Sequence, residues 1–129
     1  MKRLLFTLIM GFSFWGLFAQ TNKFKTVDAA EFAKAVADTS YVVLDVRTPS
    51  EYAEGHIPGT HFNIDVLEDS YTEIALKNLP KERPVALYCR SGNRSKNAAR
   101  ILAENGYEVV ELGSGFRGWV AAGNKIEKP

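Results

Sequence analysis

Apolar and polar positions along the chain form two patterns that alternate from one segment to the next. Residues 41–46 (YVVLDV) and 84–89 (PVALYC) are short, mainly apolar runs without strict alternation, as expected of strands covered on both faces. Between such runs, apolar residues recur every three or four positions, as in residues 26–38, which is typical of a helix with one buried side. Alternating strands and helices predict an α/β fold with a mostly parallel sheet, within one domain.

The ends of several expected helices are marked by residues that suit them. Thr26 or Asp28 can cap the first helix. Ser70 and Glu73 have the spacing of a capping box, and Gly106 suits the left-handed position after a helix end. The whole pattern predicts strands at 41–46, 61–64, 84–89 and 107–112, and helices at 26–38, 49–55, 70–79, 95–105 and 115–123.

The first nineteen residues have a different character from the rest. A short basic start (Met1 to Arg3) precedes an apolar run from Leu4 to Phe18, and Ala19-Gln20 offers a small residue at a cleavage site. This layout predicts a secretory signal peptide at 1–19 and a mature domain at 20–129. The apolar run is shorter than the roughly 20 residues that a spanning helix needs, although an uncleaved N-terminal anchor is the alternative.

Charge and cysteine content restrict the possible functions further. Without Lys2 and Arg3 the chain has 14 basic and 15 acidic residues, a balance that does not indicate a nucleic-acid binder. It contains one cysteine, Cys89, so no internal disulfide can form and the domain must fold on its hydrophobic core. That cysteine also lies too far downstream to be the lipid-bearing residue of a lipoprotein.

The segment LYCRSGNRSKNAAR, residues 87–100, surrounds this thiol with positive charge. Cys89 ends a predicted buried strand, and a helix is expected to begin just beyond Arg94. Ligands of open α/β sheets bind beyond the carboxyl ends of strands, and a helix start presents unpaired N–H groups to an anion. Gly92 lets the intervening loop curl its N–H groups inward. These features favour a thiolate and predict a nucleophile, whereas the alternative is an inert buried cysteine.

Three blocks carry a resemblance to a known family: DVRTPSEYAEGHIPGTHFNI, YCRSGNRS and ELGSGFRGW. In this order they resemble a single-domain rhodanese, and with the export signal the chain is similar to the periplasmic kind. The resemblance implies a five-stranded, mostly parallel sheet flanked by helices on both faces. It also implies sulfane-sulfur transfer through a persulfide on Cys89. The family's anion-cradling loop maps onto Arg90, Ser91, Gly92, Asn93 and Arg94.

The same resemblance implies the reaction partners. These are a small anionic sulfur donor such as thiosulfate, and cyanide, a small thiol or a protein thiol as the acceptor. No metal or organic cofactor is implied, and no stable membrane association after cleavage. Two positions depart from the family pattern: Thr60-His61, and Ser114 in place of the first glycine of a Gly-Gly pair. Neither lies in the loop, so they leave activity expected and put partner surfaces in doubt.

Two other functions remain open at this stage. A cysteine phosphatase or arsenate reductase also holds a cysteine in an anion cradle, but such enzymes resembling this fold have five residues between cysteine and arginine. Here four residues separate Cys89 from Arg94, which favours sulfur over a tetrahedral oxyanion. A non-catalytic binding module is the second alternative, and the intact Cys89 argues against it.

Other polar and aromatic residues have simpler interpretations. Asp45 is expected to accept backbone hydrogen bonds and Arg47 to pair with Glu51, although both could orient the loop. His56 and His61 lack an evident third metal ligand. Lys96 and Arg100 are expected on the solvated side of the helix or in steering the substrate, and Phe62, Phe116 and Trp119 in the core.

Overall fold

The computed structural model describes residues 23–129 of the 129-residue chain, so the predictions for residues 1–19 lie outside the described part. Its centre is a five-stranded sheet in the order β1-β5-β4-β2-β3, and each neighbouring pair is parallel. The strands are β1 (Lys25–Val27), β2 (Val42–Asp45), β3 (Phe62–Asn63), β4 (Val85–Tyr88) and β5 (Val109–Leu112). The predicted α/β fold with a five-stranded parallel sheet is therefore confirmed.

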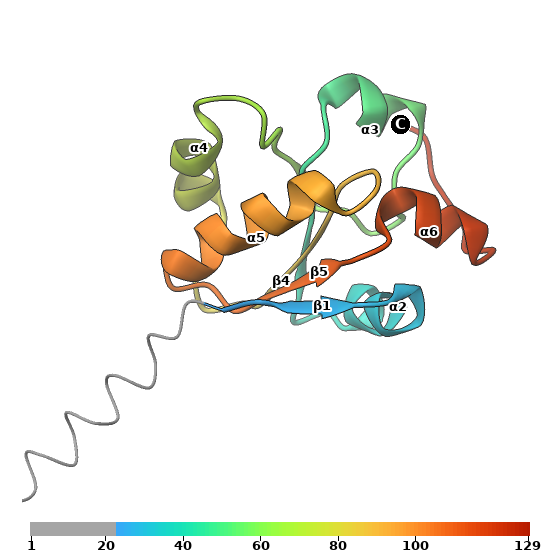
Figure 1. Ribbon diagram of the computed structural model, residues 1–129, viewed down its shortest axis with the longest axis horizontal. Coiled ribbons are helices and arrows are strands. Elements are labelled where there is room, and N and C mark those ends of the chain that lie inside the picture. The colour runs from blue at the N-terminus through green and yellow to red at the C-terminus, as the bar shows by residue number, and fades with distance from the viewer. Residues whose placement is uncertain (1–22) are drawn as a thin grey trace, which may run out of the picture.

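Helices lie on both sides of this sheet (Figure 1). The helices are α2 (Ala29–Ala37), α3 (Pro49–Glu54), α4 (Tyr71–Asn78), α5 (Asn93–Glu104) and α6 (Gly115–Ala121). One apolar cluster joins α4 and α5 to the sheet, with Tyr71, Leu87 and Leu102 among its fully or nearly buried members. A second cluster joins α2 and α6 to the opposite face through Phe32 and Trp119. Because both faces are covered, β2 and β4 are buried along their whole length.

The sequence interpretation placed residues 26–38 in one helix, and this was wrong at its start. Residues 25–27 form the edge strand β1, which pairs with β5. Asp28 is the helix cap, because its side chain accepts a hydrogen bond from the Glu31 N–H at 2.9 Å. Two of the three residues of β1 are exposed, so the sequence of this edge strand has no apolar pattern that would predict it. Only its pairing with β5 identifies it as a strand.

The expected capping box at Ser70 and Glu73 was also wrong. The Ser70 side chain makes no capping hydrogen bond at the start of α4. The structure instead has a capping box at the start of α3. The Thr48 hydroxyl accepts a hydrogen bond from the Glu51 N–H at 3.2 Å, and the Glu51 carboxylate accepts one from the Thr48 N–H at 3.0 Å. Gly106 does occupy a left-handed conformation just after α5, as predicted, with φ of 91°. Within residues 23–129, no helix combines the length and apolar character that crossing a bilayer requires.

Candidate active site

Cys89 follows directly on β4, at the carboxyl end of the sheet, and its side chain is almost wholly enclosed. Its sulfur accepts hydrogen bonds from the Gly92 N–H at 3.1 Å and the Ser95 N–H at 3.3 Å. Helix α5 begins at Asn93, two residues earlier than predicted, so Asn93 and Arg94 belong to its first turn. The sulfur therefore lies against the N-terminal end of a helix, where unpaired N–H groups and the helix dipole favour negative charge.

Gly92 makes this arrangement possible. Its φ of 99° is a left-handed conformation that side-chain-bearing residues rarely adopt. A Cβ at this position would also collide with the Gly113 carbonyl, which lies in the turn after β5. The loop can therefore pack against that turn only because residue 92 is a glycine.

The start of α6 fixes the loop from the other side. The Phe116 N–H donates to the Cys89 carbonyl at 2.8 Å, and the Arg117 N–H donates to the Arg90 carbonyl at 3.0 Å. Gly115, with φ of 67°, brings this turn so close to Arg90 that a Cβ would collide with the Arg90 carbonyl group. Two of the three sequence blocks, YCRSGNRS and ELGSGFRGW, therefore contact each other in the fold through these backbone hydrogen bonds.

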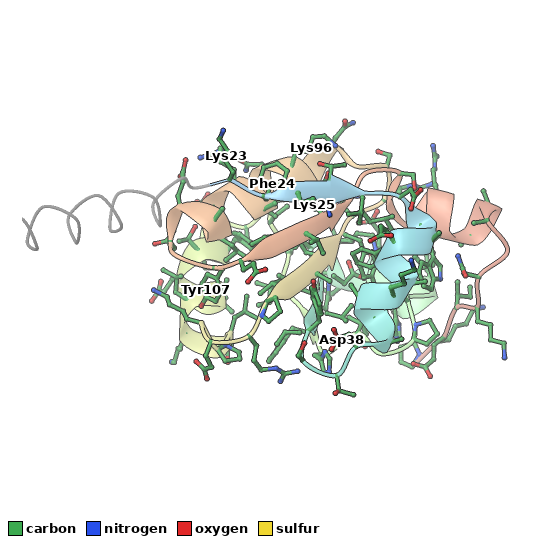
Figure 2. All side chains as sticks on the ribbon, turned by 90° about the horizontal axis from the view of Figure 1, so that it is seen from below. Lys23, Phe24, Lys25, Asp38, Lys96 and Tyr107 are labelled. Carbon is green, nitrogen blue, oxygen red and sulfur yellow. The ribbon has the colours of Figure 1, made fainter. Side chains whose placement is uncertain are left out.

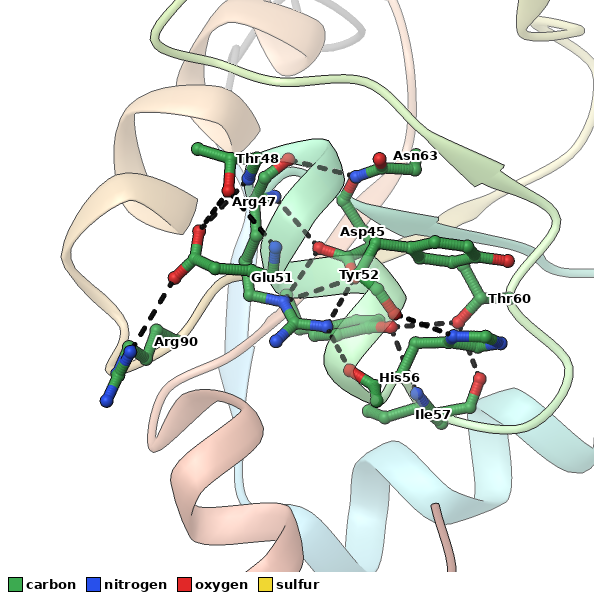
Figure 3. Close-up of polar contacts among 12 residues, drawn as sticks. Asp45, Arg47, Thr48, Glu51, Tyr52, His56, Ile57, Thr60, Asn63 and Arg90 are labelled. Atoms are coloured by element: carbon green, nitrogen blue, oxygen red, sulfur yellow. Dashed lines mark hydrogen bonds and ion pairs between the residues drawn. The ribbon is translucent and has the colours of Figure 1, made fainter. Parts of the chain in front are cut away.

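The cations around the loop have different environments. Both terminal nitrogens of Arg94 bind the Glu51 carboxylate, at 2.8 and 3.0 Å. This hydrogen bonding lowers the pKa of Glu51 to about 2 and raises the pKa of Arg94. The Arg90 side chain is 53% exposed and approaches Glu51 only to 4.0 Å (Figure 3). Arg90 therefore keeps much of its charge available to a ligand, whereas that of Arg94 is largely compensated.

The expected pairing of Arg47 with Glu51 was wrong. Arg47 is buried and binds the Asp45 carboxylate at 2.7 Å and the Gly55 carbonyl at 2.7 Å (Figure 3). Its guanidinium also lies 4.3 Å from the centre of the Phe116 ring. Asp45 does accept a backbone N–H, that of Arg47, as predicted. This buried pair joins β2 to α6, which holds the loop.

Each of the two histidines forms a hydrogen bond with a backbone group. The His61 Nδ1 accepts a hydrogen bond from the Val43 N–H at 2.9 Å. His56 stacks on the Tyr52 ring, with ring centres 3.9 Å apart, and its Nδ1 donates to the Tyr52 carbonyl at 3.1 Å. Across residues 23–129, no group of three or more His, Cys, Asp or Glu side chains is arranged to hold a metal ion.

A cavity of about 410 Å³ opens beside the loop, between α3 and α6. Arg90 and Glu51 form part of its wall, and Phe116, Arg117 and Val120 of α6 form another. Cys89 does not line it, so the cavity adjoins the loop without reaching the sulfur.

Of the residues expected in the core, Trp119 is buried, whereas Phe62 and Phe116 are only partly buried.

Sequence reasoning missed Glu111, a fully buried carboxylate in β5. It accepts hydrogen bonds from Ser95 and Thr26 and forms an ion pair with Lys96. Lys96 thus contacts both Glu111 and the Gly92 carbonyl in the loop. The sequence predicted instead that it lies on the solvated side of the helix or steers the substrate. Arg100 instead pairs with Glu104 on the exposed side of α5. The sequence signal that could have identified Glu111 is an acidic residue within the otherwise apolar run VVEL, residues 109–112.

Comparison with known proteins gives a consistent result. A family model described as a rhodanese-like domain matches residues 28–122. A sulfurtransferase of Allochromatium vinosum is 37% identical over 107 residues, which cover 80% of this chain and 94% of that protein. The thiosulfate sulfurtransferase GlpE of Pseudoalteromonas translucida is 30% identical, over 81% of this chain and 98% of that protein.

Solved structures agree with the sequence comparison. The crystal structure of a rhodanese-related protein of Thermoplasma volcanium superposes with a TM-score of 0.72 at 28% identity. That match covers 82% of this chain and 100% of the other. Together with the parallel sheet and the cysteine between β4 and α5, these matches show that the chain belongs to the rhodanese-like domain family.

Proposed function

We propose that this protein moves sulfane sulfur from thiosulfate or a similar donor to cyanide or a thiol acceptor, through a persulfide on Cys89. One observation carries the proposal: two backbone N–H groups at the start of α5 point at the Cys89 sulfur, at 3.1 and 3.3 Å. Such fixed donors stabilise negative charge on a sulfur atom without reorganising during the reaction. Its general class is that of a sulfurtransferase, in agreement with the names of its relatives.

The proposed reaction consists of two displacements at sulfur. The Cys89 thiolate attacks the outer sulfur of thiosulfate, a new S–S bond forms, and the S–S bond of thiosulfate breaks. Sulfite leaves with the electron pair of that bond, and Cys89 carries a persulfide anion. The acceptor then attacks the outer sulfur, and Cys89 departs as a thiolate. Cyanide would be released as thiocyanate, and a thiol as a persulfide. Covalent catalysis of this kind divides one transfer into two easier steps.

Arg90 is the cation best placed to meet an anionic donor. Its side chain is half exposed and lines the cavity beside the loop. Arg94 was also predicted to bind the donor, and that stays a prediction. Both of its terminal nitrogens are bound to Glu51. We therefore expect Arg94 to act on the donor mainly through the placement of Glu51 and the start of α5.

The same pairing argues against a phosphatase or arsenate reductase. Those reactions require a wide ring of amides and an arginine fork that meets two oxyanion oxygens together. In this loop both terminal nitrogens of Arg94 are engaged by Glu51, and the two amides already lie within hydrogen-bonding distance of the sulfur. We expect no useful turnover of aryl phosphates or arsenate.

Intact-mass spectrometry tests the proposal directly. The purified protein is mixed with thiosulfate, and its mass should increase by one sulfur atom. Adding cyanide should return the original mass and release thiocyanate. Cys89→Ser should fold normally, because a hydroxyl is close to a thiol in size, yet show neither the mass increase nor thiocyanate formation.

The control must separate a covalent role from a structural one. Similar urea unfolding midpoints for Cys89→Ser and the unmodified protein would establish that the variant is folded. Substantial thiocyanate formation by the folded variant would contradict the role of Cys89. An unmodified protein that gains no sulfur from any donor would instead support a binding module.

A further inference from the structure

Glu111 is a buried carboxylate for which the proposed reaction has no direct use. It lies in β5 between Thr26 of β1 and Leu87 of β4, beside the start of α5. Its side chain is fully buried. Taking a carboxylate out of water is strongly unfavourable unless hydrogen bonds replace those to water. An apolar side chain would fill a core position without that cost, so the carboxylate needs an explanation.

The first contact of interest runs from Glu111 to Ser95. The Ser95 hydroxyl donates to one Glu111 oxygen at 2.6 Å, and both side chains are fully buried. Ser95 is the third residue of α5, and its own N–H donates to the Cys89 sulfur at 3.3 Å. Glu111 therefore holds one of the two residues whose amides contact the sulfur.

The second contact runs through Lys96. The Lys96 ammonium group donates to the Glu111 carboxylate at 3.3 Å and to the Gly92 carbonyl at 3.2 Å. It reaches this position from the surface, near the β1 edge of the sheet (Figure 2). Gly92 provides the other amide that contacts the sulfur, at 3.1 Å. Both N–H donors thus belong to residues linked to the same carboxylate, Ser95 directly and Gly92 through Lys96.

We propose that Glu111 is a positioning residue for sulfur transfer, which fixes the Ser95 and Gly92 amides against the sulfur carried by Cys89. The inference rests on the proposed function of Cys89 and adds a role for Glu111, which contacts Ser95 and Lys96. A persulfide adds a sulfur atom and moves negative charge outward, so the amides must keep their directions while that charge shifts. Small misplacements of such groups reduce reaction rates strongly.

A double variant separates positioning from stability. Ser95→Ala combined with Glu111→Leu removes both partners of the buried hydrogen bond, so neither is left unpaired. Thr26 is exposed and Lys96 is half exposed, so both can bind water in place of Glu111, and folding should be preserved. The backbone N–H of residue 95 remains available to the sulfur but loses its anchor. We expect kcat for thiocyanate formation to fall about ten-fold or more, while KM for thiosulfate and the urea unfolding midpoint stay close to those of the unmodified protein.

Two single variants complete the experiment. Glu111→Gln keeps an oxygen for the Ser95 hydroxyl but loses the charge that attracts Lys96, so its kcat should be intermediate. Glu104→Gln removes a carboxylate at the far end of α5, from an exposed pair with Arg100, and should leave kcat unchanged. The inference is overturned if the folded double variant, or folded Glu111→Gln, keeps the kcat of the unmodified protein. A failure of the proposed function would look different, because the unmodified protein itself would not transfer sulfur.

Discussion

Glu51 connects the start of α3 to the loop that carries Cys89. Its carboxylate accepts a hydrogen bond from the Thr48 N–H at 3.0 Å, within the capping box of α3. It also binds both terminal nitrogens of Arg94, in the first turn of α5. The pair thus joins two helix starts through residues that are 43 positions apart in the sequence. Removing the Glu51 carboxylate should therefore make the loop less rigid without removing a contact to the Cys89 sulfur.

This contact gives the stability of the protein a defined pH dependence. The pKa of Glu51 is lowered from 4.5 to about 2, chiefly by its hydrogen bond to Arg94. Because the folded-state pKa lies below the unfolded one, the stabilisation is complete above pH 4.5 and is lost as the pH falls toward 2. Glu51→Gln should therefore lower the free energy of unfolding by about 1–2 kcal/mol at pH 6, and by less at pH 3.

Urea unfolding at several pH values measures this difference. Glu104→Gln is the matched control, because the Arg100–Glu104 pair is about half exposed on both sides and should contribute little at any pH. If the difference between the unmodified protein and Glu51→Gln were the same at pH 6 and pH 3, ionisation of Glu51 would not be its cause.

At the scale of elements, the junction between β4 and α5 determines what the site can do. The loop is short because Gly92 turns the chain directly into α5, with its N–H facing the sulfur. The turn after β5 then packs against the loop, because Gly92 lies close to the Gly113 carbonyl and Gly115 lies close to the Arg90 carbonyl. The arrangement depends on these close contacts between β4–α5 and β5–α6, which side chains at residues 92 and 115 would prevent.

Gly92→Ala and Gly106→Ala form a matched pair that tests this junction. Both glycines have left-handed φ values, 99° and 91°, so each substitution should cost about 1–2 kcal/mol in backbone strain. At Gly106 a Cβ meets nothing within 4 Å, whereas at Gly92 it meets the Gly113 carbonyl. Gly92→Ala should therefore cost about 1–3 kcal/mol more than Gly106→Ala, and should also reduce sulfur transfer.

Urea unfolding and thiocyanate formation provide the two measurements for this pair. Gly106→Ala should keep its rate of sulfur transfer when folded, because residue 106 lies at the opposite end of α5 from the sulfur. Equal losses of stability and equal rates in the two variants would mean that the loop tolerates a side chain at residue 92, and that the junction is packed less tightly than the contact between Gly92 and the Gly113 carbonyl indicates.

For the whole molecule, we propose that the chain is exported to a periplasm and cleaved after Ala19. The proposal depends on the basic start, the apolar run and the Ala19-Gln20 junction in the sequence. The packed domain extends toward this junction as far as Phe24, which lies partly buried against the α4–α5 side of the core. N-terminal sequencing of the protein from its native host should begin at or near Gln20. An intact Met1 in a membrane fraction would favour an uncleaved anchor instead.

The sequence alone determined the parts of this protein that depend on neighbours along the chain. The buried strands β2 and β4 show as apolar runs, and the helices show as apolar residues at helical spacing. Gly92 and Gly106 are recognisable because positions with a left-handed backbone strongly favour glycine. The position of Cys89 between a strand and a helix start follows from the same local patterns.

Only the tertiary structure decided which polar groups meet. Arg47 binds Asp45 and not Glu51, Glu51 binds Arg94, and Glu111 supports the loop from a different strand. An exposed ion pair contributes so little energy that sequence spacing cannot select the partner of a charged side chain. In the folded chain, burial and the alignment of distant backbone segments make that selection, and the edge strand β1 likewise exists only because β5 lies beside it.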